Sequence, residues 1–342
     1  MKKSRIILVV CLLAILLFVG INHDLVYYGL VQAKGQLGVV WNSKPVAEVL
    51  SDPDFPDSLK MKLRFMEEVK QYAVQKLGLK GIRNYTTYYD QEGKELMWVL
   101  SACQPFRLES YSWDFPILGS FTYKGFFKYE MAEKELKKLQ EEGFDASIRT
   151  AGGWSTLGIL KDPVLSKMLE RNTGSLADLV IHELTHGTIF IKDSIEFNEN
   201  LASFIGNTGA KLFLEQKYGD VSSELDDFKK KLEDQKKFSR YVLEGADQLD
   251  SLYTSFTGDM TLEDKIYKKR IRIEQFMKDI QGLSFHDPEY YHYFDDFTPD
   301  NTFFMSFLRY RGGQAHFENT LKVKHHGDLR EYIKALKEEY GR

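Results

Sequence analysis

The chain has 342 residues, of which 46 are Lys or Arg and 50 are Asp or Glu, and its formal net charge is −4. Without residues 1–24, which carry three basic residues and one acid, 43 basic and 49 acidic residues remain, a net charge of −6. A surface with no basic excess does not neutralise phosphates, so we expect no nucleic acid among the partners.

The N-terminus carries a short basic segment, Met1–Arg5, followed by an uninterrupted apolar run over residues 6–21. As a helix, this run would be about 24 Å long, against roughly 30 Å for a bilayer core. We predict an uncleaved anchor helix over 1–24, in the inner membrane, that places residues 25–342 on the extracytoplasmic (periplasmic) side. The alternative is a secreted protein, cleaved after the triplet Val31-Gln32-Ala33.

Patterns along the next 140 residues predict a small sheet among helices. Residues 25–55 are mixed in character. Apolar positions three and four apart predict helices over 57–77 and 129–142, each followed by a glycine. Alternating or β-rich runs predict strands over 85–89, 96–103 and 144–150, and residues 154–159 are predicted to extend the sheet. Asp162-Pro163 predicts the start of a short helix.

A helical segment then carries His182, Glu183 and His186 in the pattern H-E-x-x-H. Residues four apart on a helix share one face, so the two imidazoles can bind one zinc ion, while Glu183 is offset and can reach the water of a catalytic zinc. Ser175 predicts the N-cap of this helix, with Asp178 as its capping-box partner. Burying these polar groups on an apolar helix would be costly without a metal.

A catalytic zinc takes three protein ligands and keeps the fourth position for water. The third ligand must therefore come from outside the pair of histidines. Glu199, thirteen residues after His186 in the run Asn198-Glu199-Asn200, is the nearest well-placed candidate.

The C-terminal part of the chain is predicted to be helical. Two amphipathic segments, 221–256 and 261–280, are separated by a short turn at Gly258, with Thr261 as the N-cap of the second. They predict an antiparallel helical hairpin within residues 210–285, with its charges on a solvated face. Further helices are predicted over 300–311 and 326–340, so the fold class is α+β, mainly helical.

Several blocks occur in a fixed order along the chain: Tyr123-Lys124-Gly125-Phe126-Phe127, Trp154–Gly158, Asp162–Leu165, His182–His186 and Phe197-Asn198-Glu199. In these blocks the chain resembles the bacterial family of zinc aminopeptidases, which is related to the gluzincin metallopeptidases, from about Tyr27 to Lys337. The resemblance implies a zincin-like fold and a Zn²⁺ peptidase acting on a peptide substrate, with His182, His186 and Glu199 as ligands and Glu183 as general base.

Two further positions concern the oxyanion and the bracing of the ligands. Gluzincins use a Tyr or His as oxyanion donor, and Tyr310 matches a position that the family fills with Tyr; Asn301 is a similar candidate. Thermolysin-like members place an acid four residues after the third ligand, where this chain has Ser203. The groups that brace the histidines must therefore come from elsewhere.

Two other readings of the motif remain open. A membrane-tethered scaffold would keep zinc as a structural ion, and a zinc hydrolase could cleave a non-peptide amide such as a cell-wall fragment. A structural zinc site has no need of a general base, so Glu183 favours an enzyme.

Overall fold

The computed structural model describes residues 2–81, 84–115, 119–150, 161–192 and 194–340. Within these residues the chain is mainly helical, with small mixed sheets, so the α+β class is confirmed. The helices are α1 (Lys2–Ile21), α2 (His23–Trp41), α3 (Val46–Ser51), α4 (Asp57–Gln75), α5 (Tyr129–Glu141), α6 (Thr173–Thr188), α7 (Ile195–Tyr218), α8 (Ser223–Thr254), α9 (Leu262–Asp279), α10 (Asn301–Arg311), α11 (Gln314–Lys324) and α12 (Leu329–Tyr340).

In the part of the chain that the structure describes, the strands form three small sheets rather than the one that the sequence predicts. An antiparallel sheet has the order β6-β3-β7, a second has the order β1-β2-β8 with β2 and β8 parallel, and β4 pairs with β5. The strands are β1 (Lys44–Pro45), β2 (Thr87–Tyr89), β3 (Trp98–Cys103), β4 (Trp113–Phe115), β5 (Gly119–Phe121), β6 (Lys124–Phe126), β7 (Asp145–Thr150) and β8 (Val164–Leu165). The strand predicted over 144–150 is confirmed as β7, which lies at one end of its sheet among the described residues.

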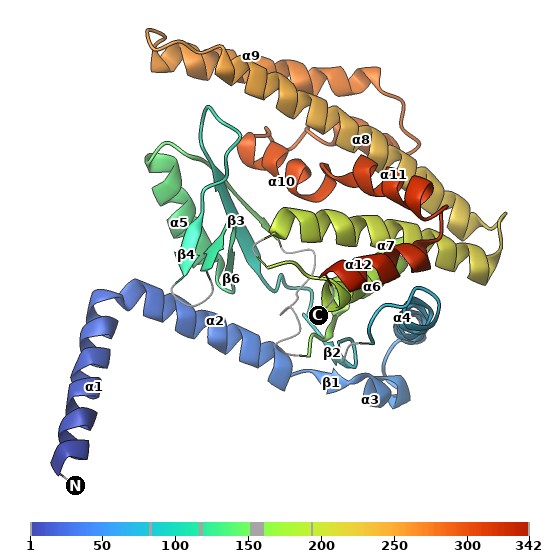
Figure 1. The fold of residues 1–342 in the computed structure, drawn as a ribbon, viewed down its shortest axis with the longest axis horizontal. Coiled ribbons are helices and arrows are strands. Elements are labelled where there is room, and N and C mark those ends of the chain that lie inside the picture. The colour runs from blue at the N-terminus through green and yellow to red at the C-terminus, as the bar shows by residue number, and fades with distance from the viewer. Residues whose placement is uncertain (1, 82–83, 116–118, 151–160, 193, 341–342) are drawn as a thin grey trace.

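Helices α6 and α7 lie at the centre of the molecule (Figure 1). Leu176, Val180, Ile181 and Leu184 of α6 are all at most 1% exposed and belong to the largest apolar core, which α4 and α12 also line. Apolar residues therefore cover several faces of α6, as expected of a helix buried in a core. The polar residues of the motif are fixed within this packing.

The predicted helical hairpin is confirmed as α8 and α9, which run antiparallel along one side of the molecule (Figure 1). Thr261 caps α9 by accepting a hydrogen bond from the backbone N–H of Asp264. Phe238 and Val242 of α8, Phe276 of α9 and Phe304 of α10 form a second, aromatic-rich core. Helix α10 thus joins the hairpin to the rest of the molecule.

At the N-terminus, α1 points away from the body, and α2 lies beside the sheet of β3 and β6 (Figure 1). Residues 25–55, described above as mixed in character, are not so throughout: their first part belongs to α2 (His23–Trp41), which is helical despite its glycines. Gly35 has a packing reason, since an added Cβ would overlap the ring of Phe127. Of the helices in the described residues, none is long and apolar enough to cross a membrane. The predicted anchor is not confirmed.

Two other predicted boundaries need correction. Asp162-Pro163 does not open a helix, because Asp162 is buried and its Oδ2 accepts a hydrogen bond from Asn84 Nδ2 at 2.8 Å; the short 3₁₀ helix begins after β8, at Ser166. The last helix starts at Leu329 rather than 326, because His326 and Gly327 have positive φ angles of 51° and 82°. The predicted strand over 154–159 lies outside the described residues.

Candidate metal centre

Helix α6, which carries the H-E-x-x-H residues, begins two residues earlier than its expected cap. Asn172 is the N-cap, and its side chain accepts a hydrogen bond from the backbone N–H of Ser175 at 2.9 Å. The predicted cap at Ser175 is therefore wrong. An added Cβ on Gly174 would lie 2.4 Å from the ring of Phe228, so this glycine in the first turn lets α8 pack against α6.

Helices α6 and α7 approach closely through small residues on α7. Ala202 is fully buried, and a Cβ added to Gly206 would lie 3.1 Å from the backbone oxygen of Asp178 and 3.2 Å from Cβ of His182. A Cβ on Gly209 would lie 3.1 Å from Ile181. This close approach brings Glu199, near the start of α7, to the two histidines of α6.

Three donor atoms meet where the helices cross. Nε2 of His182 and Nε2 of His186 are 3.1 Å apart, and Oε2 of Glu199 lies 3.5 Å from the first and 3.6 Å from the second. In the described residues, these side chains form the one group of three or more that could hold a metal ion. The structure thus brings together the three residues that the sequence predicts as ligands.

The charges in this group are strongly coupled. Burial alone would lower the pKa of His182, but the hydrogen bond to Glu199 and the charges of Glu183, Glu199 and Asp178 raise it. Burial would raise the pKa of Glu199, yet the hydrogen bonds from both histidines hold it far below its usual range. Both shifts have the same cause, the attraction between the Glu199 carboxylate and the imidazole of His182.

Asp178, one turn before His182, lies within electrostatic reach of the centre. Its carboxyl is buried, which raises its pKa, while the charges of His182, Lys231 and Arg311 oppose that shift. An acid is thus placed against His182, although the position after the third ligand holds Ser203. In the sequence, the one sign that Asp178 acts on His182 is its place four residues earlier on the same helix.

Glu183 stands close to a tyrosine that the sequence does not single out. Tyr85 is 4% exposed; burial raises the pKa of its phenol, and the charge of Glu183 raises it further. Its φ angle of 62° is rare for a bulky residue. Strained backbone conformations of this kind cluster at functional sites. Together with the effect of Glu183 on its pKa, this counts Tyr85 among the residues around the candidate general base.

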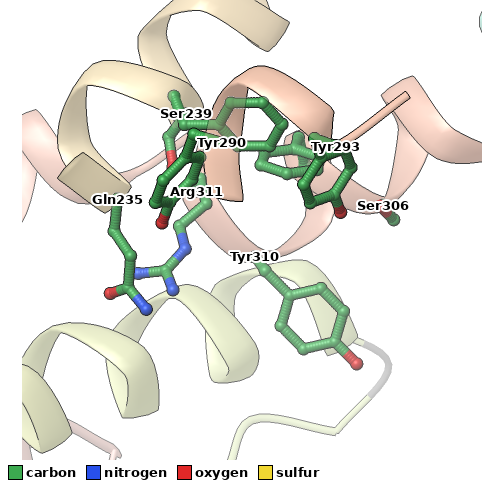
Figure 2. A pocket seen from close by; sticks show the side chains of 9 residues that line it. Gln235, Ser239, Tyr290, Tyr293, Ser306, Tyr310 and Arg311 are labelled. Carbon is green, nitrogen blue, oxygen red and sulfur yellow. The ribbon is translucent and has the colours of Figure 1, made fainter. Parts of the chain in front are cut away.

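Tyr310, the predicted oxyanion donor, lies within electrostatic reach of Glu199. Burial and the charge of Glu199 raise its pKa, and a hydrogen bond with Arg149 opposes the shift, so the phenol is neutral at pH 7. It also lines a cavity of about 280 Å³ with Gln235, Tyr290 and Arg311. Figure 2 shows the Tyr310 ring pointing away from Tyr290 and Gln235.

Asn301, the other predicted donor, is occupied elsewhere. Its Nδ2 donates to the carbonyl oxygen of Gln104 at 2.8 Å, and its Oδ1 accepts a hydrogen bond from Tyr253 at 2.7 Å. It therefore fixes α10 to α8 and to the loop after β3. Trp154–Gly158, one of the blocks that carry the family resemblance, lies outside the described residues.

A large groove of about 1450 Å³ runs beside the N-terminal half of α7. Glu196 and Asn200 of α7, Arg309 of α10 and Phe121 of β5 are among its lining residues. Asn200 directly follows the candidate ligand Glu199, and its Nδ2 donates to the carbonyl oxygen of Arg309 at 2.5 Å. The groove therefore runs along the part of α7 that carries Glu199, and its volume has room for several residues of an extended chain.

A family model described as "Putative aminopeptidase" matches residues 27–340. No curated protein and no solved structure matches the chain.

Proposed function

The chain belongs to the "Putative aminopeptidase" family, and we propose that it is a zinc-dependent peptidase of gluzincin type. The observation that carries the proposal is the spacing of the three donor atoms, 3.1, 3.5 and 3.6 Å. Ligands about 2.0–2.1 Å from a tetrahedral zinc lie roughly 3.3 Å from one another. Two imidazoles and a carboxylate, with room for one more ligand, form a donor set typical of catalytic zinc.

In the proposed reaction, bound zinc supplies an acidic water and polarises the scissile carbonyl. The Glu183 carboxylate takes the proton from the attacking water and gives it to the leaving amine. Tyr310, neutral because its pKa is raised, donates a hydrogen bond to the oxygen on which negative charge develops. The buried acid Asp178 contributes negative charge beside His182.

Replacement of Glu183 by Gln separates an enzyme from a scaffold. We expect Glu183→Gln to keep one zinc per chain and to lose about 10²–10⁴-fold in peptidase rate, because proton transfer is removed. The exposed Glu244 of α8 offers the matched control Glu244→Gln, which should keep both. Metal analysis and peptide cleavage are the measurements.

The peptides should include pairs with free and acetylated N-termini. Cleavage of only the free forms would establish aminopeptidase action. Full activity in Glu183→Gln would remove the proposed base, and a zinc-loaded protein that cleaves no peptide would favour the structural zinc or the non-peptide amide.

We also propose an extracytoplasmic location for residues 25–342, with residues 6–21 as the attachment to the inner membrane. Three basic residues precede the apolar run, and its large side chains are exposed, among them Ile7, Leu13 and Leu17. Protease accessibility in spheroplasts tests this, since a body that stays protected in intact spheroplasts would contradict it.

A further inference from the structure

Two arginines from separate elements meet beside the candidate metal centre. Arg149 is on β7, and Arg309 is on α10. The guanidinium of Arg309 lies 5.5 Å from the centre of the Tyr123 ring, and that of Arg149 lies 6.0 Å from the centre of the Tyr310 ring. The two phenols and the two guanidiniums thus form a cluster, Tyr123, Arg149, Arg309 and Tyr310, called the arginine cluster below.

Arg309 is costly to bury in this position. Arg309 is only 7% exposed, whereas Arg149 is exposed, and among the described residues no ion pair joins either arginine to a carboxylate. Burial lowers the pKa of Arg309, and the positive charge of Arg149 lowers it further, against the opposing effects of Tyr310, Tyr123 and Glu199. A buried cation beside a second cation is a strong site for an anion.

Glu199 does not supply that anion. Its Oε2 lies 3.5–3.6 Å from both histidine Nε2 atoms, so its carboxylate is directed to the candidate metal centre. A carboxylate that binds a metal has less charge left for a guanidinium. With a divalent cation bound, the surroundings of Arg309 would be more positive still.

The groove makes Arg309, one member of the cluster, accessible. Arg309 lines the groove of about 1450 Å³, together with Thr122, the neighbour of Tyr123. Guanidinium groups bind carboxylates in bidentate geometry, and neutral phenols add further donors. An anionic group of a substrate lying in the groove could therefore reach the arginine cluster through Arg309.

We propose that the arginine cluster is a carboxylate-binding subsite, and that the preferred substrates are peptides with a carboxylate close to the scissile bond. This inference rests on the proposed peptidase function. The carboxylate comes from either the free C-terminus of a short peptide or the side chain of Asp or Glu, and both present the same group to the guanidiniums.

Substrate pairs that differ only in charge test the subsite. The full-length zinc-loaded protein is given alanine pentapeptides with a free or amidated C-terminus, and amidated peptides in which one alanine is Asp or Asn. We expect at least one carboxylate peptide to exceed its neutral partner by about 10–100-fold in kcat/KM, mainly through KM. The member of the set that is preferred identifies the source of the carboxylate.

Arg309→Gln should abolish that preference, and Arg149→Gln should reduce it. Arg240 of α8, which is exposed, gives the control Arg240→Gln, which should keep it. If Arg309→Gln instead lowers kcat equally for charged and neutral peptides, the arginine acts on the oxyanion and the subsite is excluded.

Binding to the Glu183→Gln protein separates this inference from the proposed function. We expect calorimetry to show tighter binding of the carboxylate peptide than of its amide, and loss of the difference in Glu183→Gln/Arg309→Gln. Such binding without cleavage by the wild-type protein would overturn the peptidase and keep the subsite. Cleavage with no preference for carboxylates would overturn the subsite and keep the peptidase, and neither binding nor cleavage would overturn both.

Discussion

Two helix pairs that follow one another in the sequence are built in opposite ways. Helices α6 and α7 approach through Gly206 and Gly209 and bury polar side chains between them. Helices α8 and α9 pack through large rings, with Tyr241 stacked on Phe276 at 4.5 Å between ring centres, and leave their charges in solvent. A metal centre needs donor atoms within a few tenths of an ångström, so it belongs to the pair whose backbones cannot shift.

Among the substitutions that test this difference between the two helix pairs, loss of one metal ligand should have the largest effect on function. We expect His186→Ala to abolish zinc binding and peptidase activity, because two ligands do not hold a catalytic zinc. His292, exposed and paired with Asp295 at 2.8 Å, provides the control His292→Ala, which should retain both. Zinc content and cleavage rate are measured together, and a fully active His186→Ala protein would show that the metal centre lies elsewhere.

A methyl group added between the helices should have the next largest effect. Gly206→Ala would place a Cβ 3.1 Å from the backbone of α6, so we expect a loss of about 1–3 kcal/mol in the free energy of unfolding, together with weaker zinc binding. Gly258, in the turn between α8 and α9, has no atom within 4 Å of an added Cβ. Gly258→Ala should therefore change stability by less than about 0.5 kcal/mol in urea denaturation. Equal losses of stability from Gly206→Ala and Gly258→Ala would contradict the tighter packing argued for α6 and α7.

Removal of the acid behind His182 should have a smaller effect. Asp178→Asn leaves the ligands in place but takes away a charge that raises the pKa of His182. We expect zinc affinity to fall about 10–100-fold, as for other groups that brace a ligand, without loss of the fold. Competition with a chelator measures this, and unchanged affinity would mean that Asp178 only fills space. Ser203→Ala, at the position where related enzymes place an acid, should bind zinc as the wild type does.

A change on the solvated face of the hairpin should have the smallest effect. Nε of Arg270 lies 3.8 Å from the carboxylate of Glu274, and both side chains are about half exposed. Arg270→Gln should change the free energy of unfolding by less than about 0.5 kcal/mol and leave activity unaltered, because exposed ion pairs contribute little. A large loss of activity would indicate that this face takes part in function.

The sequence predicts what is local in this molecule and misses what depends on distant packing. The H-E-x-x-H residues lie on one helix, and Glu199 follows at the start of the next, so their meeting could be expected. Arg309 is 160 residues from Arg149, and no spacing rule joins them. Tyr123 lies in one of the blocks that carry the family resemblance, but its position beside Arg309 follows only from the way α10 packs on the sheet.

Secondary structure shows the same division. Helix α5 and the hairpin α8–α9 show regular apolar spacing and clear ends, and both were predictable. Helix α2 contains three glycines, which disfavour helix, and it forms because it packs against the sheet. The 3₁₀ helix after β8 was misplaced because Asp162 bonds to Asn84 rather than capping.

Helix α2 also bears on how the protein is processed. Tyr28 donates a hydrogen bond to the carbonyl oxygen of Gly125 at 2.8 Å, and Gln32 accepts one from the backbone N–H of Phe127 at 3.2 Å. The two side chains thus form hydrogen bonds with backbone groups at the edge of the sheet formed by β6. Proteolytic removal of residues up to Ala33 would expose that edge, and an uncovered strand recruits other chains into aggregates. We therefore expect cleavage after Ala33 to give an aggregation-prone product, whereas cleavage before Tyr28 would keep this edge covered.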